Sequence, residues 1–432
     1  MTWAQLMIFL VIVAFALLMG GFWIAASLGL AGILGLFVSG SGHIVSAIAN
    51  IVWNTVNDFT LTAIPLFLFM GDIILVSGLS NNFYRGIAKF LKRIPGGLLH
   101  SNIVACAIFA AISGSSVATA AGIGSVAIPV MKERNYKREH IYGSLAAGGT
   151  LGILIPPSIP LVIYGSLTST SVVKLFVAAM TPGLFLAGLY LLFLVVNSFI
   201  DKKGYAQVKK DDEFENISWK SALVGVFPMF LLVGLIFGSI YTGYATPTEA
   251  AGIGSFIAIV VGKIFGKLKF KQIWDAAKSS VKTTSMIVFI MLGAQIFTYV
   301  LTSTGASRAM VSWLTALGLS KWVFLIIVYI IYIFLGCFMD GNSMQFLTLP
   351  ILFPVLMEYG FNPIWFGIVL VVLIELGQVT PPMGMNLFVI NGIDKTSTLK
   401  EIIVGVIPYV FIMILMVAIL TFFPNLVLFS VT

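Results

Sequence analysis

The chain has 432 residues, of which 59% are hydrophobic and only 9% are charged, whereas a soluble domain carries about 25% charged residues. This composition excludes an ordinary soluble protein. Repeated apolar runs of about 17 residues or more predict an all-α polytopic membrane protein. The net charge of +8 indicates basic loops rather than nucleic-acid binding. The sequence contains no P-loop motif that would indicate ATP hydrolysis, no cysteine framework that would indicate disulfides, and no histidine cluster that would indicate a metal centre.

Residues 1–40 are predicted to form two short spans that break at Gly20-Gly21, with one long tilted helix as the alternative. No basic residue precedes the first apolar run. This run is therefore interpreted as a membrane segment rather than a cleaved secretory peptide.

Four basic clusters are expected on the cytoplasmic side by the positive-inside rule. They are Arg85 to Arg93, Lys132 to Arg138, Lys202 to Lys220, and Lys263 to Lys282. Residues 101–131 lie between the first two clusters and carry no charge. They must leave and return to the same side, so a re-entrant hairpin broken at Ser113–Ser116 is predicted. Broken backbone at membrane depth survives only inside protein or beside a cavity.

The remaining apolar segments then thread in and out consistently. We expect spans at 141–165, 171–197, 221–241, 245–262 and 283–304, a second hairpin at 323–357, and spans at 364–392 and 402–428. The polar linker 198–220 and the basic loop 263–282 separate some of them. The amphipathic stretches 82–99 and 307–322 occupy matching positions before the two hairpins. They are interpreted either as interfacial arms or as simple connecting helices.

The chain contains a repeat whose second copy runs the opposite way through the membrane. "IPLFLFMGDIILVSG" (64–78) resembles residues 286–305. "SGSS" at 113, "IPVMKE" at 128 and "ILIPPSIPLVIYG" at 153 fall opposite "DGNS", "FPVLME" and "QVTPPMGMNLFVING", at offsets of 227, 225 and 225 residues. Inverted repeats with broken helices characterise secondary transporters. The proline pairs at 156–157 and 381–382 should unwind the two spans, although an isolated proline kink is the simpler alternative for each.

Unwound turns expose carbonyl oxygens, and such oxygens suit a hard cation that has lost its water. Each hairpin tip is expected to pair with the broken helix that follows it, which gives at least two Na+ sites with the substrate between them. The predicted sodium ligands are Ser113, Gly114, Ser115, Ser116, Gly152, Ile155, Pro156, Asp340, Gly341, Asn342, Ser343, Gly377, Thr380, Pro381 and Met383. The predicted substrate-binding residues are Ser116, Thr119, Thr150, Asn342, Ser343 and Asn386.

Acidic residues in the apolar segments are candidates for function. Asp340 stands at the second hairpin tip, where it could bind a cation or hold a tip amide; capping a short helix is the alternative. Glu249 is interpreted as a first-turn helix acid after Pro247. Glu375 is either structural or near the site. No Lys or Arg lies inside either hairpin or broken helix, so the charge of an anionic substrate would have to be met by sodium and helix N-termini.

At these residues the chain resembles the large membrane (M) subunit of tripartite ATP-independent periplasmic (TRAP) transporters. "SGSSVATAAGIGSVAIPVM", "GTLGILIPPSIPLVIYG", "TPTEAAGIG" and "QVTPPMGMNLFVING" carry the resemblance, which covers essentially the full length. "MGGFW" at 19–23 departs from it, because a proline is expected after the glycine. The family resemblance implies an elevator-type secondary transporter in the bacterial inner membrane, and no enzyme.

The resemblance also implies partners and a division into domains. A separate small membrane subunit (Q) and a periplasmic substrate-binding protein (P) are expected. The substrate would be a C4-dicarboxylate, sialic acid or a related sugar or keto acid, imported with sodium. Residues 60–170 and 283–396 would carry the moving elements, and residues 1–59, 171–282 and 397–432 the scaffold.

Three other functions remain as alternatives. A sodium/anion symporter without a binding protein would transport with this chain alone. A channel would need a continuous pore. A membrane enzyme would need a catalytic constellation on one apolar face, and the sequence offers no candidate.

Overall fold

The computed structural model describes residues 2–40, 44–201, 217–381 and 384–431, which form helices joined by turns. Seven helical segments in these ranges are long and apolar enough to cross a membrane. The first-repeat half of the chain comprises α1 (Trp3–Met19), α2 (Ile24–Val38), α3 (Ile44–Val56), η1 (Phe59–Thr62), α4 (Ala63–Val76), α5 (Leu79–Leu91), α6 (Leu98–Ser113), α7 (Ser116–Glu133), α8 (Arg138–Leu154), α9 (Ile159–Thr168) and α10 (Val172–Ile200). The other half comprises α13 (Trp219–Tyr241), α14 (Pro247–Ile264), α15 (Phe270–Ser303), α16 (Ala306–Ala316), α17 (Lys321–Gly336), α18 (Gly341–Glu358), α19 (Pro363–Val379), α20 (Met385–Ile393), α21 (Leu399–Phe422) and α22 (Asn425–Leu428).

The first forty residues form two helices, as predicted. α1 ends at Met19, and Gly21 turns the chain with φ at +81°, a conformation that glycine adopts without strain. The extended residue Trp23 then precedes α2. The pair Gly20-Gly21 therefore breaks the segment, and the alternative of one long tilted helix is wrong.

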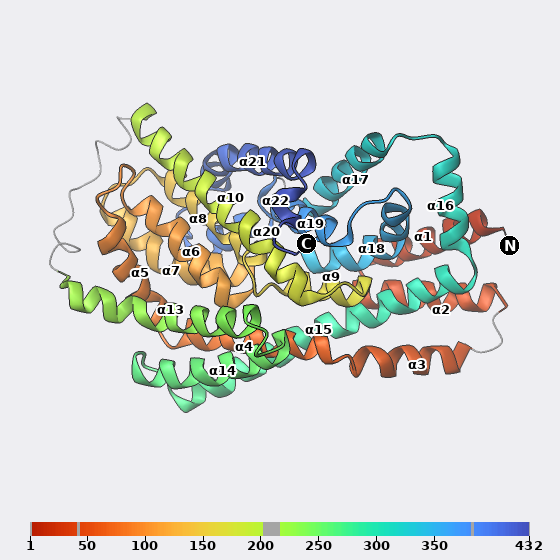
Figure 1. Cartoon of the computed structure of the whole chain (residues 1–432), viewed down its shortest axis with the longest axis horizontal. Helices are drawn as coiled ribbons and strands as arrows, with labels where there is room; N and C mark the ends of the chain where they lie inside the picture. Colours follow the sequence, from red (N-terminus) through yellow and green to blue (C-terminus); the bar gives the residue numbers. More distant parts are fainter. Residues whose placement is uncertain (1, 41–43, 202–216, 382–383, 432) are drawn as a thin grey trace.

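The inverted repeat is visible in the order and direction of the helices. α4 to α9 are followed by the long helix α10, and α15 to α20 are followed by the long helix α21. Each amphipathic helix, α5 and α16, begins after a left-handed glycine, Gly78 at φ 77° and Gly305 at φ 72°. α4 packs against α15 and runs in the opposite direction (Figure 1). The predicted repeat and its inversion are thus confirmed.

Two predicted boundaries are wrong. Residues 263–282 were expected as a loop, but α15 already begins at Phe270 and continues for 34 residues. Lysine is a good helix former, and the first glycine after Phe270 is Gly293. The predicted span 402–428 is interrupted at Pro424, so that it forms α21 and the single-turn α22.

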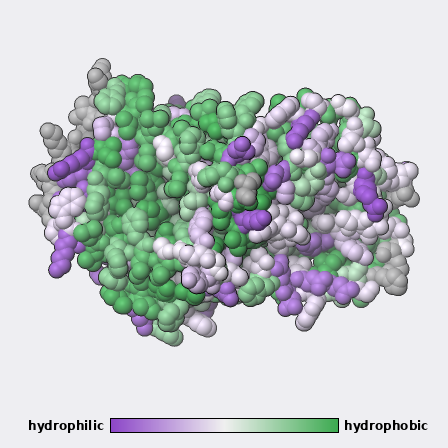
Figure 2. Space-filling view, in the orientation of Figure 1, coloured by the Kyte–Doolittle hydropathy of each residue, from purple (hydrophilic) through white to green (hydrophobic). Residues whose placement is uncertain are grey.

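The outer surface carries apolar side chains where a lipid bilayer would cover it. α10 exposes Leu192 and Phe199, and α13 exposes Leu223 and Phe227, each by more than half of its area. Figure 2 shows the broad apolar area on this side of the molecule, with hydrophilic residues at its left edge. Exposed apolar area of this extent indicates a surface that faces lipid rather than water.

Small residues bring the helices of the core unusually close together. A Cβ added to Gly143 of α8 would lie 2.1 Å from the carbonyl oxygen of Gly405 in α21. A Cβ added to Gly405 would lie 2.1 Å from the carbonyl oxygen of Glu139. Glycine crossings of this kind let two backbones touch, which drives helix association in membranes. α8 and α21 are therefore one packed unit.

Candidate functional site

The first hairpin is broken by a glycine cap followed directly by a serine cap. Gly114, at φ 59°, ends α6, and the Ser115 side chain accepts a hydrogen bond from the amide of Ala118 to begin α7. Behind this turn, the hydroxyls of Ser113 and Thr119 lie 2.8 Å apart, and both side chains are buried. The predicted hairpin and its break are confirmed, although Ser113 and Ser116 themselves are helical.

The first hairpin tip lies against the first broken helix. α8 ends at Leu154, and Ser158 caps α9 by accepting from the amide of Leu161, which leaves residues 155–158 unwound. The amide of Ile159 donates to the carbonyl of Gly114 over 3.4 Å. A Cβ on Gly152 would lie 2.7 Å from the Ser115 carbonyl oxygen and 2.8 Å from Thr119 Oγ1. The expected pairing of this tip with the following helix is therefore correct.

The second hairpin tip is built differently from the prediction. Residues 337–340 form the turn, and Asp340 caps α18 by accepting from the amides of Asn342 and Ser343, both over 3.1 Å. The Ser343 hydroxyl also donates to this carboxylate. Gly341, Asn342 and Ser343 consequently lie in the first turn of a helix and not in an unwound segment. Asp340 therefore caps α18, the role given as the alternative, and its role as a sodium ligand stays a prediction.

The second tip also lies against the broken helix that follows it. A Cβ on Gly341 would lie 3.2 Å from Gln378 Nε2. Beside it, Gly336 and Gly377 cross so closely that a Cβ on Gly336 would be 2.7 Å from the Gly377 Cα. α19 ends at Val379 with Thr380 extended, and α20 begins at Met385. The predicted ligand Met383 lies outside the described residues, and Pro381 stands in the break.

One hydrogen bond joins the two halves at the centre. The hydroxyl of Ser116, at the start of α7, donates to the side-chain oxygen of Gln378 in α19, although 262 residues separate them. Both side chains are buried. Gln378 therefore touches the first tip through Ser116 and lies beside the second tip at Gly341. Gln378 was not among the predicted site residues; its only signal in the sequence is a polar side chain three positions before the second proline pair.

Two amides and one carboxyl are buried beside these tips without a well-formed hydrogen bond to any described residue. They belong to Asn386 in α20, Gln345 in α18 and Glu375 in α19. Asn386 lies against α8, since a Cβ on Gly149 would be 3.4 Å from its amide nitrogen. Buried polar groups in native proteins are nearly always paired. An unpaired amide is thus available to a bound ligand, which supports the selection of Asn386.

The hydroxyl of Thr150, a predicted substrate residue, forms a hydrogen bond within its own helix. Its hydroxyl donates to the carbonyl of Ala147 over 2.6 Å, and it lies in α8 beside Tyr190 of α10. Glu375 lies near the same tyrosine and the end of α8 at Leu154. Thr119, in contrast, lies directly behind the first tip. The structure therefore brings Thr119 and Ser116 to the tip and leaves Thr150 one layer behind.

A second long-range contact joins the other end of α7 to the residue that follows α20. Lys132, near the end of α7, forms an ion pair of 2.9 Å with Asp394, the residue that follows α20. Tyr142 donates to the same carboxylate over 2.8 Å, as does Thr396. Burial alone would raise the pKa of Asp394, but these hydrogen bonds outweigh it and hold the pKa well below its ordinary value.

Replacing Asp394 with asparagine is expected to lower the melting temperature of the purified protein. Hydrogen bonds to a charged group contribute about 1.5–3 kcal/mol each. Because the folded pKa is depressed, the stabilisation is complete above the unfolded pKa of about 4 and is lost as the pH falls below it. The difference between wild type and variant should stay constant from about pH 5 to pH 8, by thermal unfolding. The exposed Asp275→Asn serves as the control. A wild-type melting temperature retained by Asp394→Asn would contradict the assignment.

The inverted repeat, the paired hairpins and the broken helices define the chain as a multi-pass membrane transport protein. The family model of the tripartite ATP-independent periplasmic transporter DctM component matches residues 11–426. The chain belongs to this family, and it is a large permease of the inner membrane.

Individual relatives agree with this family. The chain is 36% identical over 405 residues to the C4-dicarboxylate TRAP transporter large permease protein DctM of Pseudomonas aeruginosa, covering 92% of each chain. It is 30% identical over 377 residues to the sialic acid TRAP transporter large permease protein SiaM of Vibrio cholerae, covering 86% of each. Among solved structures, the YdaH transporter of Alcanivorax borkumensis has the same fold, with a TM-score of 0.63 at 14% identity over 90% of this chain and 89% of that one.

Proposed function

We propose that the chain imports an organic anion together with sodium by an elevator motion, and that a periplasmic binding protein delivers the substrate. The observation that carries this proposal is that both hairpin tips lie at Gln378, the first through its hydrogen bond from Ser116 and the second at Gly341. The side chain of Gln378 is an uncharged amide. A site between two inverted halves is the arrangement found in secondary transporters.

The residues present fit sodium ions. At the first tip, the Ser113 and Thr119 hydroxyls and the Ser115 carbonyl oxygen lie together beside Gly152. At the second, the Asp340 carboxylate and the Ser343 hydroxyl lie together at the start of α18. Hydroxyl, carbonyl and carboxylate oxygens are the ligands that hard cations take. When bound, sodium would supply positive charge next to the substrate, which no Lys or Arg at either hairpin tip provides.

The substrate would lie between the two tips. Asn386 and Gln345 offer unpaired amides on α20 and α18. Neutral donors can bind a carboxylate, and the missing positive charge makes its binding depend on sodium. Two relatives are named for the transport of C4-dicarboxylate and of sialic acid. These two substrates differ in structure, but both carry a carboxylate. The proposed substrate class is therefore an organic acid, either a dicarboxylate or a sugar or keto acid.

The packing supports a moving unit that is larger than the sequence indicated. The hairpins and broken helices were assigned as moving elements, with α10 and α21 in the scaffold. However, α21 crosses α8 at Gly143 and Gly405 with backbone contact, and Tyr190 of α10 packs on Tyr409 of α21 at 5.3 Å between ring centroids. Two helices in backbone contact move together. We therefore propose that α10 and α21 travel with the hairpins, and that α5 and α16 connect this unit to the remaining helices.

Sodium dependence tests the assignment of the two sites. Ser116→Ala and Ser343→Ala should each raise the sodium concentration needed for half-maximal uptake by about tenfold or more, since one oxygen at or beside each site is lost. The measurement is substrate uptake into proteoliposomes that contain the large permease and a small membrane subunit, with and without periplasmic binding protein. Ser125→Ala, an exposed serine of the same helix α7, is the control. Unchanged sodium dependence in both variants would remove the sodium sites, and full uptake without binding protein would favour the independent symporter.

A further inference from the structure

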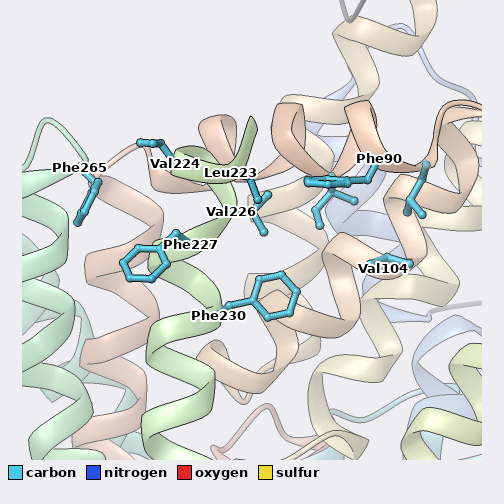
Figure 3. A pocket seen from close by; sticks show the side chains of 10 residues that line it. Phe90, Val104, Leu223, Val224, Val226, Phe227, Phe230 and Phe265 are labelled. Atoms are coloured by element: carbon cyan, nitrogen blue, oxygen red, sulfur yellow. The ribbon is translucent and has the colours of Figure 1, made fainter. Parts of the chain in front are cut away.

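An apolar hollow of about 750 Å³ opens on the lipid-facing side between α5, α6 and α13. Figure 3 shows Leu223, Val226, Phe227 and Phe230 of α13 between Phe265 on one side and Phe90 and Val104 on the other. Every residue that lines the hollow is aliphatic or aromatic. Phe227 and Phe230 are about half exposed, at 53% and 50%. The hollow can therefore hold a hydrocarbon chain but offers nothing to a polar ligand.

A polar hollow of about 300 Å³ adjoins the apolar one. Val224 and Phe265 line both, and the polar hollow adds Asn82, Arg85 and Ser221. Two further cations stand close by on the same side: Lys89 lies 5.5 Å from the centroid of the Trp219 ring, and Lys220 follows that residue. Lys92 and Arg93 follow the C-terminal end of α5. The apolar hollow, which can hold a hydrocarbon chain, is thus adjacent to a polar hollow with basic residues around it.

The place of these hollows in the membrane is given by the topology. α5 and the start of α13 belong to the basic clusters that the positive-inside rule puts in the cytoplasm. Trp219 contacts Phe90 at 5.4 Å between ring centroids, and tryptophan is enriched at membrane–water interfaces. The cytoplasmic leaflet is the one that carries anionic lipids, and basic pockets between helices on that side bind their head groups.

We propose that one anionic phospholipid of the cytoplasmic leaflet binds here, with an acyl chain in the apolar hollow and its phosphate at Asn82, Arg85 and Ser221. A helix of a second protein fits less well. A helix with its side chains is about 10 Å wide, which is much wider than an acyl chain. The lipid would contact both α6 of the first hairpin and α13, and it would therefore bridge these two helices.

The experiment measures lipid retained by the purified large permease in complex with its small subunit, using native mass spectrometry. Phosphatidylglycerol and phosphatidylethanolamine with identical chains are added in competition. Wild type should retain phosphatidylglycerol preferentially. The double variant Arg85→Gln/Lys89→Gln should lose about tenfold or more of that preference, since each cation near the surface contributes about a factor of five. Arg308→Gln in α16, the corresponding helix of the other repeat, should change nothing.

A second variant tests the chain-binding part separately. Val104→Trp fills the apolar hollow without changing charge, and it should reduce retention of both lipids while the melting temperature without added lipid stays near the wild-type value. Equal retention of the two lipids by wild type, or unchanged preference in the double variant, would overturn the head-group site. Undiminished retention by Val104→Trp would overturn the location. Retention of phosphatidylglycerol by the large permease alone but not by its complex with the small subunit would assign the hollow to that subunit instead. None of these outcomes depends on the proposed sodium coupling.

Discussion

Replacing Gln378 with leucine is expected to lower substrate uptake by about tenfold to a hundredfold while the protein remains folded. The side chains differ little in volume, but leucine cannot accept the hydroxyl of Ser116. A buried hydroxyl left without a partner costs about 1–3 kcal/mol, and 1.4 kcal/mol corresponds to a factor of ten. The loss should fall on transport, because Gln378 binds the first hairpin tip through Ser116 and lies beside the second at Gly341.

A double-mutant cycle separates this coupling from general damage. Uptake is measured for Ser116→Ala, for Gln378→Leu and for the combination. If the two side chains act through their shared hydrogen bond, the double variant should be little worse than the poorer single variant. Losses that simply multiply would show that the two residues act independently, and the proposed link between the halves would then fail.

Replacing Gly143 with valine is expected to prevent recovery of folded protein. The added Cβ alone would lie 2.1 Å from the Gly405 carbonyl oxygen, which is a backbone atom and cannot rotate away. Moving α8 from α21 would also displace the unwound segment that carries Ser158. Overpacking of a tight core costs about 1–3 kcal/mol and occasionally more, and the backbone contact here places this site at the upper end.

The measurement is the monodisperse fraction in size-exclusion chromatography after extraction, together with the melting temperature of any folded protein. Gly188→Ala in α10 is the matched control, because a Cβ there would meet nothing within 4 Å. Alanine is the better helix former by about 1 kcal/mol, so this control should be unaffected or slightly more stable. A Gly143→Val protein that extracts and melts like wild type would contradict the close crossing.

Much of the fold was predictable from the sequence, because membrane proteins obey a few strong rules. The apolar lengths give the helices, and the basic clusters give their direction. An uncharged segment between two cytoplasmic clusters must turn back, which is why the hairpin at Ser113–Ser116 could be predicted. The constant offset between the two proline pairs then gave the second copy. Each of these inferences uses only local composition and the cost of exposing backbone to lipid.

The tertiary structure decided what the tips touch. The sequence alone could not show whether Asp340 caps a helix, and only the position of the amides of Asn342 and Ser343 shows that it caps α18. The contact of Ser116 with Gln378 likewise joins residues 262 positions apart. Local pattern fixes which residues are polar, whereas packing of separate segments fixes their partners. For the same reason Gly143 had no signal of its own until α21 was placed against it.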